Sequence, residues 1–178
     1  KDEWGSSYAT PVPATLHGRG VVLVYAGGEG NPATGGLLCI DAIDGTVLSR
    51  FPWRDDEYIQ AIGSSPAVIA EQNRVFISTA YPKGRPLGGV MIEFDADFKA
   101  REIWRSAKVA THWMTPVVHE GHLYAIDGET ERVAQLVCVN AENGEEKWRK
   151  DISWEDTELA AGRSSNLGIQ RASLLRVD

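Results

Sequence analysis

The fold is decided by residues 115–148, which read TPVVHEGHLYAIDGETERVAQLVCVNAENGEEKW. This stretch opens on a Thr-Pro pair, continues through two runs rich in β-branched and other apolar residues, and ends in a polar turn and a tryptophan. Apolar runs of this length, bounded by Gly, Pro, Asn and Asp, are typical of short strands joined by tight turns. Helical periodicity is nearly absent, so we expect β structure throughout.

The same order of features is repeated along the chain. A first copy opens at Thr10-Pro11, a second at Ser65-Pro66, and a fourth begins at residues 171–174 and stops. The equivalent positions 11, 66, 116 and 172 are 55, 50 and 56 residues apart. This period exceeds that of helical repeats and fits one four-stranded blade of a β-propeller. We therefore predict an all-β fold, a partial β-propeller of four-stranded antiparallel blades, with about three full blades plus the start of a fourth.

Residues 1–178 are expected to form a single propeller region that is a fragment of a longer propeller. The approximate blades are expected at 5–57, 58–109, 110–162 and 163–178, the last of them incomplete. Three blades and a fraction do not close a ring, because propellers typically have four to eight blades. We expect the remaining blades to come from missing sequence or from other chains.

The composition is that of an ordinary globular protein. Of the 178 residues, 43% are hydrophobic and 24% are charged, and the formal net charge is −7. No apolar run approaches the roughly 20 residues that a membrane-spanning helix needs. The acidic balance and the lack of a Lys/Arg cluster argue against a nucleic-acid binder. We expect neither a membrane span nor a nucleic-acid partner.

The two cysteines, Cys39 and Cys138, stand two residues before Asp41 and Asn140, at equivalent places in the first and third copies. Equivalent positions two blades apart cannot reach the Cα separation of about 4.4–6.8 Å that a disulfide requires. We expect two reduced core residues that do not pair. Their spacing also excludes a C-x-x-C metal or redox motif.

Polar residues close the third strand of each copy. Asp41, Asp95 and Asn140 stand where the chain turns toward the fourth strand. Side chains of this type cap turns by accepting hydrogen bonds from nearby backbone N–H groups. Gly45 and Gly144 supply the positive φ that a tight turn needs. We expect all five residues to be structural.

The turn from Asn140 to Trp148 resembles the tryptophan-docking motif of quinoprotein-type (PQQ-like) β-propellers, whose blades read roughly Asp-Ala-x-Thr-Gly-x-x-x-Trp. Residues 94–104 resemble the motif with one extra residue and no glycine. The resemblance covers essentially the whole chain and extends to the family of the scaffold lipoprotein of outer-membrane β-barrel assembly. It implies that Trp104 and Trp148 are structural and pack between neighbouring blades.

The first copy departs from this motif. Residues 41–49 keep the Asp-Ala and Gly positions but place Ser49 where the tryptophan is expected. Phe51 or Trp53 could substitute for it.

The resemblance implies a non-catalytic binding or scaffolding propeller of the bacterial cell envelope, exported to the periplasm or envelope. We expect a protein partner or a small polar ligand, no cofactor, no metal and no catalytic residues. One alternative is a fragment of a PQQ- and calcium-dependent alcohol or sugar dehydrogenase. Such enzymes often carry two adjacent cysteines against the cofactor, whereas Cys39 and Cys138 are 99 positions apart. A second alternative is a lectin-like propeller that binds sugars or peptides.

Two sets of connections should meet at one end of a blade. They are the connections into each inner strand and the loops that join the second and third strands. Ligands are expected there, and the candidate residues for a ligand or partner face are Tyr58, His112, Trp113, Asp127 and Arg132. The acidic run at 154–158 is expected to be a solvated loop before the fourth copy. Residues 174–178 are expected to form a strand that heads into a turn.

Overall fold

The computed structural model describes residues 4–27, 34–54, 62–81, 86–128, 134–159, 163–169 and 172–177. They form three four-stranded antiparallel sheets and one two-stranded hairpin. Helix within these ranges is limited to the short 3-10 helix η1 (Ala70–Gln72). The predicted all-β fold, a partial propeller of four-stranded antiparallel blades, is therefore confirmed. None of the described helical residues forms a helix long and apolar enough to cross a membrane.

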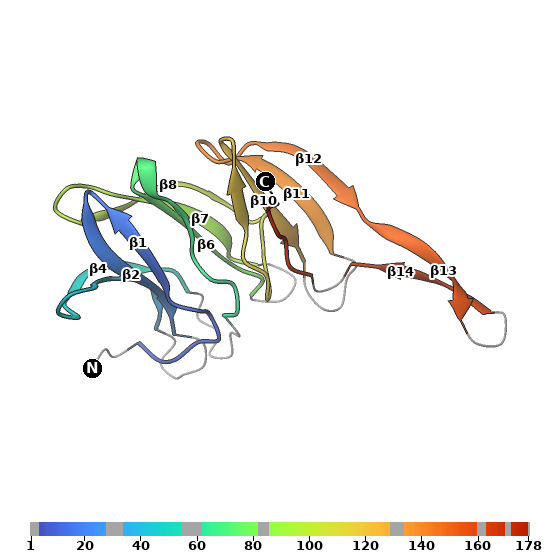
Figure 1. Cartoon of the computed structure of the whole chain (residues 1–178), viewed down its shortest axis with the longest axis horizontal. Coiled ribbons are helices and arrows are strands. Elements are labelled where there is room, and N and C mark those ends of the chain that lie inside the picture. Colours follow the sequence, from blue (N-terminus) through green and yellow to red (C-terminus); the bar gives the residue numbers. More distant parts are fainter. Residues whose placement is uncertain are drawn as a thin grey trace.

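Each sheet is a meander in which neighbouring strands follow one another in the chain. The first sheet contains β1 (Val12–Leu16), β2 (Arg19–Ala26), β3 (Gly36–Asp41) and β4 (Val47–Pro52). The second contains β5 (Ala67–Ile69), β6 (Arg74–Thr79), β7 (Gly88–Phe94) and β8 (Ala100–Ser106). The third contains β9 (Val117–His119), β10 (His122–Asp127), β11 (Gln135–Asn140) and β12 (Glu146–Asp151). The three sheets lie side by side in chain order (Figure 1).

Two apolar layers hold the sheets together. The layer between the first and second sheets includes Leu23, Tyr25, Cys39, Val75, Ile77, Val90 and Ile92. The layer between the second and third sheets includes Phe76, Met91, Trp104, Leu123, Ala125, Val137 and Val139. Successive side chains of a strand point to opposite faces. The second sheet is therefore buried on both faces, and each large side chain in these layers contributes about 1.5–3 kcal/mol by leaving water.

The Ser/Thr that precedes proline at the start of each copy links one sheet to the next. The backbone N–H of Thr10 donates to Ser65 Oγ at 2.9 Å, and the N–H of Ser65 donates to Thr115 Oγ1 at 3.2 Å. Each hydroxyl satisfies a backbone donor of the preceding sheet. This ladder gives a physical reason for a hydroxyl residue before the proline.

The turn between the third and fourth strands is capped by an Asp or Asn side chain in all three sheets. The Oδ1 atoms of Asp41, Asp95 and Asn140 each accept two backbone N–H groups of their own turn at 2.6–3.3 Å. Gly45 and Gly144 lie at φ of 76° and 71°, in the left-handed region. Cys39 and Cys138 precede these turns in β3 and β11, and both are buried and free.

The acidic run at 154–158 is not a loop, contrary to the prediction. It lies within β13 (Ser153–Leu159), which pairs with β14 (Arg163–Gly168). Charge alone predicted a loop, but the partner strand pairs with the backbone of this run, and Glu155 remains exposed on the ribbon. The predicted strand at 174–178 is also wrong, because its described residues, 174–177, have no regular secondary structure. Ala172 and Leu174 instead pack against the apolar layer of the third sheet.

Candidate functional site

One end of the three sheets gathers the segments that lead into the inner strands. We call it the connection end and define it by residues 4–11, 62–66 and 107–116. In an antiparallel meander the loop between the second and third strands falls at the same end as the start of the first strand. Gly128 begins the loop after β10 and donates its N–H to Ala110 O at 3.0 Å. This hydrogen bond joins the loop after the second strand of the third sheet to the segment that leads into its first strand.

Four aromatic rings meet at the connection end. We call them the aromatic cluster: Tyr8, Tyr81, His112 and Trp113. The ring of Trp113 lies 5.5 Å from Tyr8 in an edge-on arrangement and 4.8 Å from the His112 imidazole. The hydroxyl of Tyr81 and the Nε2 atom of His112 are 3.1 Å apart and share a hydrogen bond. Tyr8 is 62% exposed and Trp113 38%, whereas His112 is buried.

A glycine lets this cluster span three sheets. Tyr8, Gly63 and Trp113 each stand three residues before the proline that opens their copy. A Cβ atom on Gly63 would lie 2.2 Å from the Trp113 ring. Because Gly63 has no side chain, Trp113 of the third copy lies across the second copy and reaches Tyr8 of the first. Tyr8 is fixed there by donating its N–H to Ile62 O at 2.9 Å.

The candidates from the sequence are only partly brought together. His112 and Trp113 lie in the aromatic cluster. Asp127 lies instead at the end of β10, where it accepts the N–H of Ala110 at 2.7 Å. Tyr58 and Arg132 lie outside the described residues.

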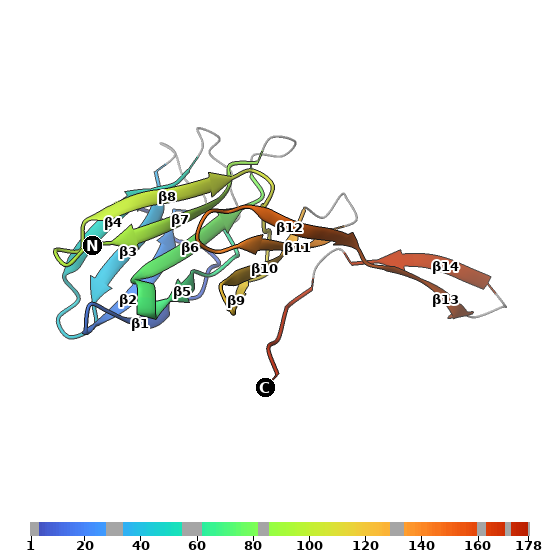
Figure 2. The same ribbon diagram turned by 90° about the horizontal axis from the view of Figure 1, so that it is seen from above.

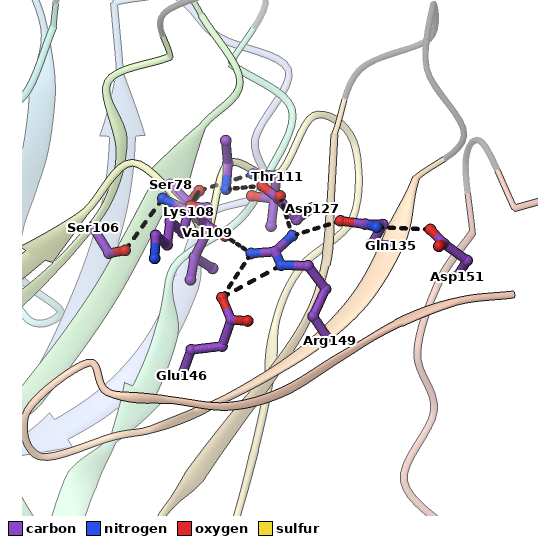
Figure 3. A network of polar contacts seen from close by, with 11 residues as sticks. Ser78, Ser106, Lys108, Val109, Thr111, Asp127, Gln135, Glu146, Arg149 and Asp151 are labelled. Carbon is purple, nitrogen blue, oxygen red and sulfur yellow. Dashed lines mark hydrogen bonds and ion pairs between the residues drawn. The ribbon is translucent and has the colours of Figure 1, made fainter.

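A polar network centred on Arg149 holds the segment that precedes His112 (Figure 3). The Arg149 Nη1 atom donates to Asp127 Oδ2 at 2.5 Å and to Gln135 Oε1 at 3.1 Å. Its Nη2 atom donates to Lys108 O at 2.5 Å. Burial raises the pKa of Asp127, while the Ala110 N–H and Arg149 pull it in the opposite direction. The network therefore gives Asp127 an anchoring role.

The second sheet anchors the same segment from the other side. The hydroxyl of Ser78 in β6 donates to Val109 O at 2.7 Å and accepts the N–H of Thr111 at 2.9 Å. His112 and Trp113 thus follow a segment tied to both the second and the third sheets. Side chains held in this way lose little further conformational freedom when they bind a partner.

Two hydroxyls in these segments lack a hydrogen-bond partner. Ser64 Oγ and Thr111 Oγ1 are buried and unpaired within the described part of the chain. Leaving a buried polar group unsatisfied costs about 1–3 kcal/mol. Because both hydroxyls are buried, the exposed rings of Tyr8 and Trp113 are the part of the cluster that a partner can contact.

The described residues contain no cluster of metal-binding side chains. Within them, no three His, Cys, Asp or Glu side chains are grouped closely enough to hold a metal ion. Cys39 and Cys138 lie in separate sheets, which does not match a pair of cysteines against a quinone.

Sequence reasoning missed Tyr8, Tyr81 and Arg149. Tyr8 was detectable, because it has the same offset from its proline as Trp113. Tyr81 follows β6 and Arg149 lies in β12, and neither stands in a recognisable motif. Their roles depend on which segments of neighbouring sheets lie beside them.

Comparison with known proteins identifies the family. The family model described as outer membrane protein assembly factor BamB matches residues 33–173. No curated protein matched. The solved structure of BamB from Moraxella catarrhalis is 14% identical with a TM-score of 0.52, and the match covers 97% of this chain and 54% of that one.

A second solved structure has the same fold. Quinohemoprotein alcohol dehydrogenase from Comamonas testosteroni is 20% identical with a TM-score of 0.52, and the match covers 83% of this chain and 21% of that one. The chain therefore spans about half and about a fifth of the length of these two proteins. At 20% and 14% sequence identity, these two matches show only that this chain shares their fold. With its four-stranded sheets and its match over residues 33–173, the chain belongs to the BamB family of PQQ-like β-propeller repeat proteins.

Proposed function

We propose that the chain is a non-catalytic, protein-binding part of a scaffold propeller in the bacterial cell envelope. The observation that carries the proposal is the aromatic cluster, in which Trp113 and the more exposed Tyr8 meet at the connection end. The family description, outer membrane protein assembly factor, favours a protein as the partner.

Physical chemistry supports a binding role for this cluster. Tryptophan and tyrosine are enriched in protein interfaces and dominate their binding free energy. Trp113 contributes its ring from a segment that Ser78 and Arg149 hold on both sides. A ring that is already held in place loses less conformational entropy on binding, so more of the free energy gained by burying it contributes to affinity.

The dehydrogenase alternative makes a different prediction. It requires tight binding of pyrroloquinoline quinone together with calcium, and a fold shared with a quinohemoprotein does not by itself confer that chemistry. Calorimetric titration with the quinone and calcium should yield no sub-micromolar binding. Calcium-dependent dye reduction with simple alcohols or glucose would overturn the scaffold proposal.

Site-directed photo-crosslinking tests the binding role. A benzophenone amino acid replaces Trp113 in one variant and Ile43 in the control, in cells that make the whole protein. Ile43 is 93% exposed and lies in the turn between β3 and β4, at the end opposite the aromatic cluster. We expect an outer-membrane assembly protein to be crosslinked from position 113 and not from position 43. The same products from both positions, or none from position 113, would contradict the proposal.

A further inference from the structure

The hairpin β13–β14 projects away from the three sheets. Both views place it beyond the third sheet, extended into solvent (Figures 1 and 2). In the described part of the chain, β13 and β14 pair with each other and with no other strand. An isolated two-stranded hairpin is at best marginally stable in water. A ribbon of this kind gains stability when a third strand or another surface covers it.

The two faces of the hairpin differ. Trp154 of β13 pairs across the ribbon with Leu167 of β14, and these side chains are 51% and 38% exposed. Glu155, the next residue of β13, has the opposite orientation and is exposed and polar, whereas Asp156 shares the orientation of Trp154. One face of the hairpin therefore presents the exposed Trp154–Leu167 pair beside Asp156, and the other face presents Glu155.

The outer edge of β13 is open. Because β14 occupies one edge of β13, the backbone N–H and C=O groups of the other edge are unpaired in the described sheet. Such edges are usually protected by Lys, Pro or a bulge. Residues 153–159 read SWEDTEL, with three acidic residues and no Lys or Pro. The register of β13 shifts between Asp156 and Leu159, so the regular edge consists of residues 153–156. The edge at 153–156 is available for pairing and carries the acidic residues Glu155 and Asp156.

We propose that β13 binds a basic, extended segment of a partner protein by strand addition. Main-chain hydrogen bonds along the open edge would hold the segment, and alternate side chains would give specificity. On one face of the ribbon a Lys or Arg side chain would lie opposite Glu155, and on the other face an apolar side chain would cover Trp154. This interaction is independent of the aromatic cluster, which lies on other segments.

The acidic charge disfavours a second copy of this chain as the occupant. Two β13 edges brought together would place acidic residues opposite acidic residues, and like charges directly opposite destabilise a strand pair. A basic strand removes this repulsion and gains cross-strand attraction. The same argument disfavours acidic segments of other proteins.

A peptide titration tests strand addition. The probe is a nine-residue peptide of alternating Lys and Val with blocked ends and a fluorescent label. The control peptide has the same charge and sequence but is N-methylated at alternate residues, so that it cannot complete a strand pair. We expect N-methylation to weaken binding about tenfold or more, and the unmodified peptide to slow hydrogen exchange at 153–159. Equal binding of both peptides, or slowed exchange only elsewhere, would overturn the proposal.

A pair of variants tests the position of the site. Glu155→Lys with Thr157→Lys changes the charge of β13, and Thr46→Lys with Glu142→Lys makes the same change at exposed turns of the first and third sheets. We expect the β13 variant to lose about tenfold in peptide affinity and the control to lose less than about threefold. Equal losses would indicate general attraction to an acidic protein and would overturn the proposal. Dimerisation through β13 without peptide binding would assign the edge to a second copy and would also overturn it.

Discussion

Two rows of side chains occupy the same register in neighbouring sheets but differ in burial. The row in the second sheet is Ala67, Phe76, Met91 and Trp104. The row in the third sheet is Val117, Tyr124, Cys138 and Trp148. All four residues of the first row are buried, at most 8% exposed, whereas only Cys138 is buried in the second. The third sheet covers the first row, and no four-stranded sheet in the described part of the chain covers the second.

The surroundings of the two tryptophans explain the difference. Trp104 packs on Gly144 of the next sheet, and its Nε1–H donates to Ala141 O at 3.0 Å. Trp148 has Tyr124 at 6.0 Å and the Lys150 ammonium 5.7 Å from its ring. The turn of the following sheet, rather than the tryptophan's own motif, therefore determines its burial.

The uncovered face still has an apolar groove of about 500 Å³. Val117, Tyr124 and Leu136 line it from the third sheet, and Leu174 lines it from the segment that runs back along the sheet. A short segment with no regular structure covers less surface than a four-stranded sheet, so Trp148 remains half-buried.

The largest expected effect comes from truncating the covered tryptophan. Trp104→Ala should lower the free energy of unfolding by about 3–5 kcal/mol, because it removes a buried indole and leaves a cavity. Trp148→Ala should cost about 1–2 kcal/mol, because its indole is only half-buried. Urea denaturation of both variants checks the order. Equal losses, or a larger loss at Trp148, would contradict the comparison.

The glycine beneath Trp104 should give the next largest effect. Gly144→Ala places a Cβ 2.6 Å from the Trp104 ring at a φ of 71°. Backbone strain and overpacking together should cost about 2–4 kcal/mol. Gly45 has a similar φ of 76° and open space around its Cβ position, so Gly45→Ala should cost only about 1 kcal/mol. Thermal melts that rank the two variants in the opposite order would show that Trp104 does not rest on this turn.

Acid should weaken the turn of the first sheet, which is capped by Asp41, but not the turn of the third sheet, which is capped by Asn140. Hydrogen bonds from the N–H of Ile43 and, to a smaller extent, from the Arg19 side chain lower the pKa of Asp41 in the folded protein. Ionised Asp41 therefore stabilises the fold above the unfolded pKa of about 3.9, and this contribution is lost as pH falls through the lower folded pKa. Asp41→Asn keeps an acceptor for the turn, as Asn140 does, but abolishes the titration.

Denaturation series below about pH 5 measure this difference. We expect the stability of Asp41→Asn to fall less steeply with acid than that of the unaltered protein. Identical slopes would mean that the Asp41 carboxylate gains nothing from its turn.

The smallest effect is expected at the connection end. Gly63→Ala should displace Trp113 from Tyr8, because the new Cβ would lie 2.2 Å from the indole. Trp113 is partly exposed and can move, so stability should change by only about 0.5 kcal/mol. Fluorine NMR of 5-fluorotryptophan-labelled protein, with Trp113→Phe to assign the signal, should show a shifted Trp113 resonance. An unchanged resonance would contradict the packing of Trp113 over Gly63.

The all-β repeat was predictable because turn residues and apolar runs recur in fixed order. The positions of Asp41, Gly45, Asn140 and Gly144 in tight turns depend on local hydrogen bonds and φ, which a short stretch of sequence determines. The strand at 154–158 was missed because its pairing with residues 163–168 depends on a partner that charge patterning does not reveal.

Contacts between sheets were less predictable. The sequence motif is better preserved around Trp148 than around Trp104, yet Trp104 is the buried one. Burial depends on which sheet lies opposite, and the motif does not contain that information. The cluster of Tyr8 with Trp113 likewise depends on the absence of a side chain at Gly63, in a third segment.

Hydrogen exchange of the indole N–H groups tests most directly the claim that a neighbouring sheet determines the environment of each tryptophan. The Trp104 indole donates to Ala141 O in a buried setting, whereas no hydrogen bond of the Trp148 indole occurs among the described residues. NMR should find the Trp104 Nε1–H exchanging at least about 100-fold more slowly than that of Trp148, as expected for a buried, bonded group. Equal exchange rates, or slower exchange at Trp148, would contradict the account.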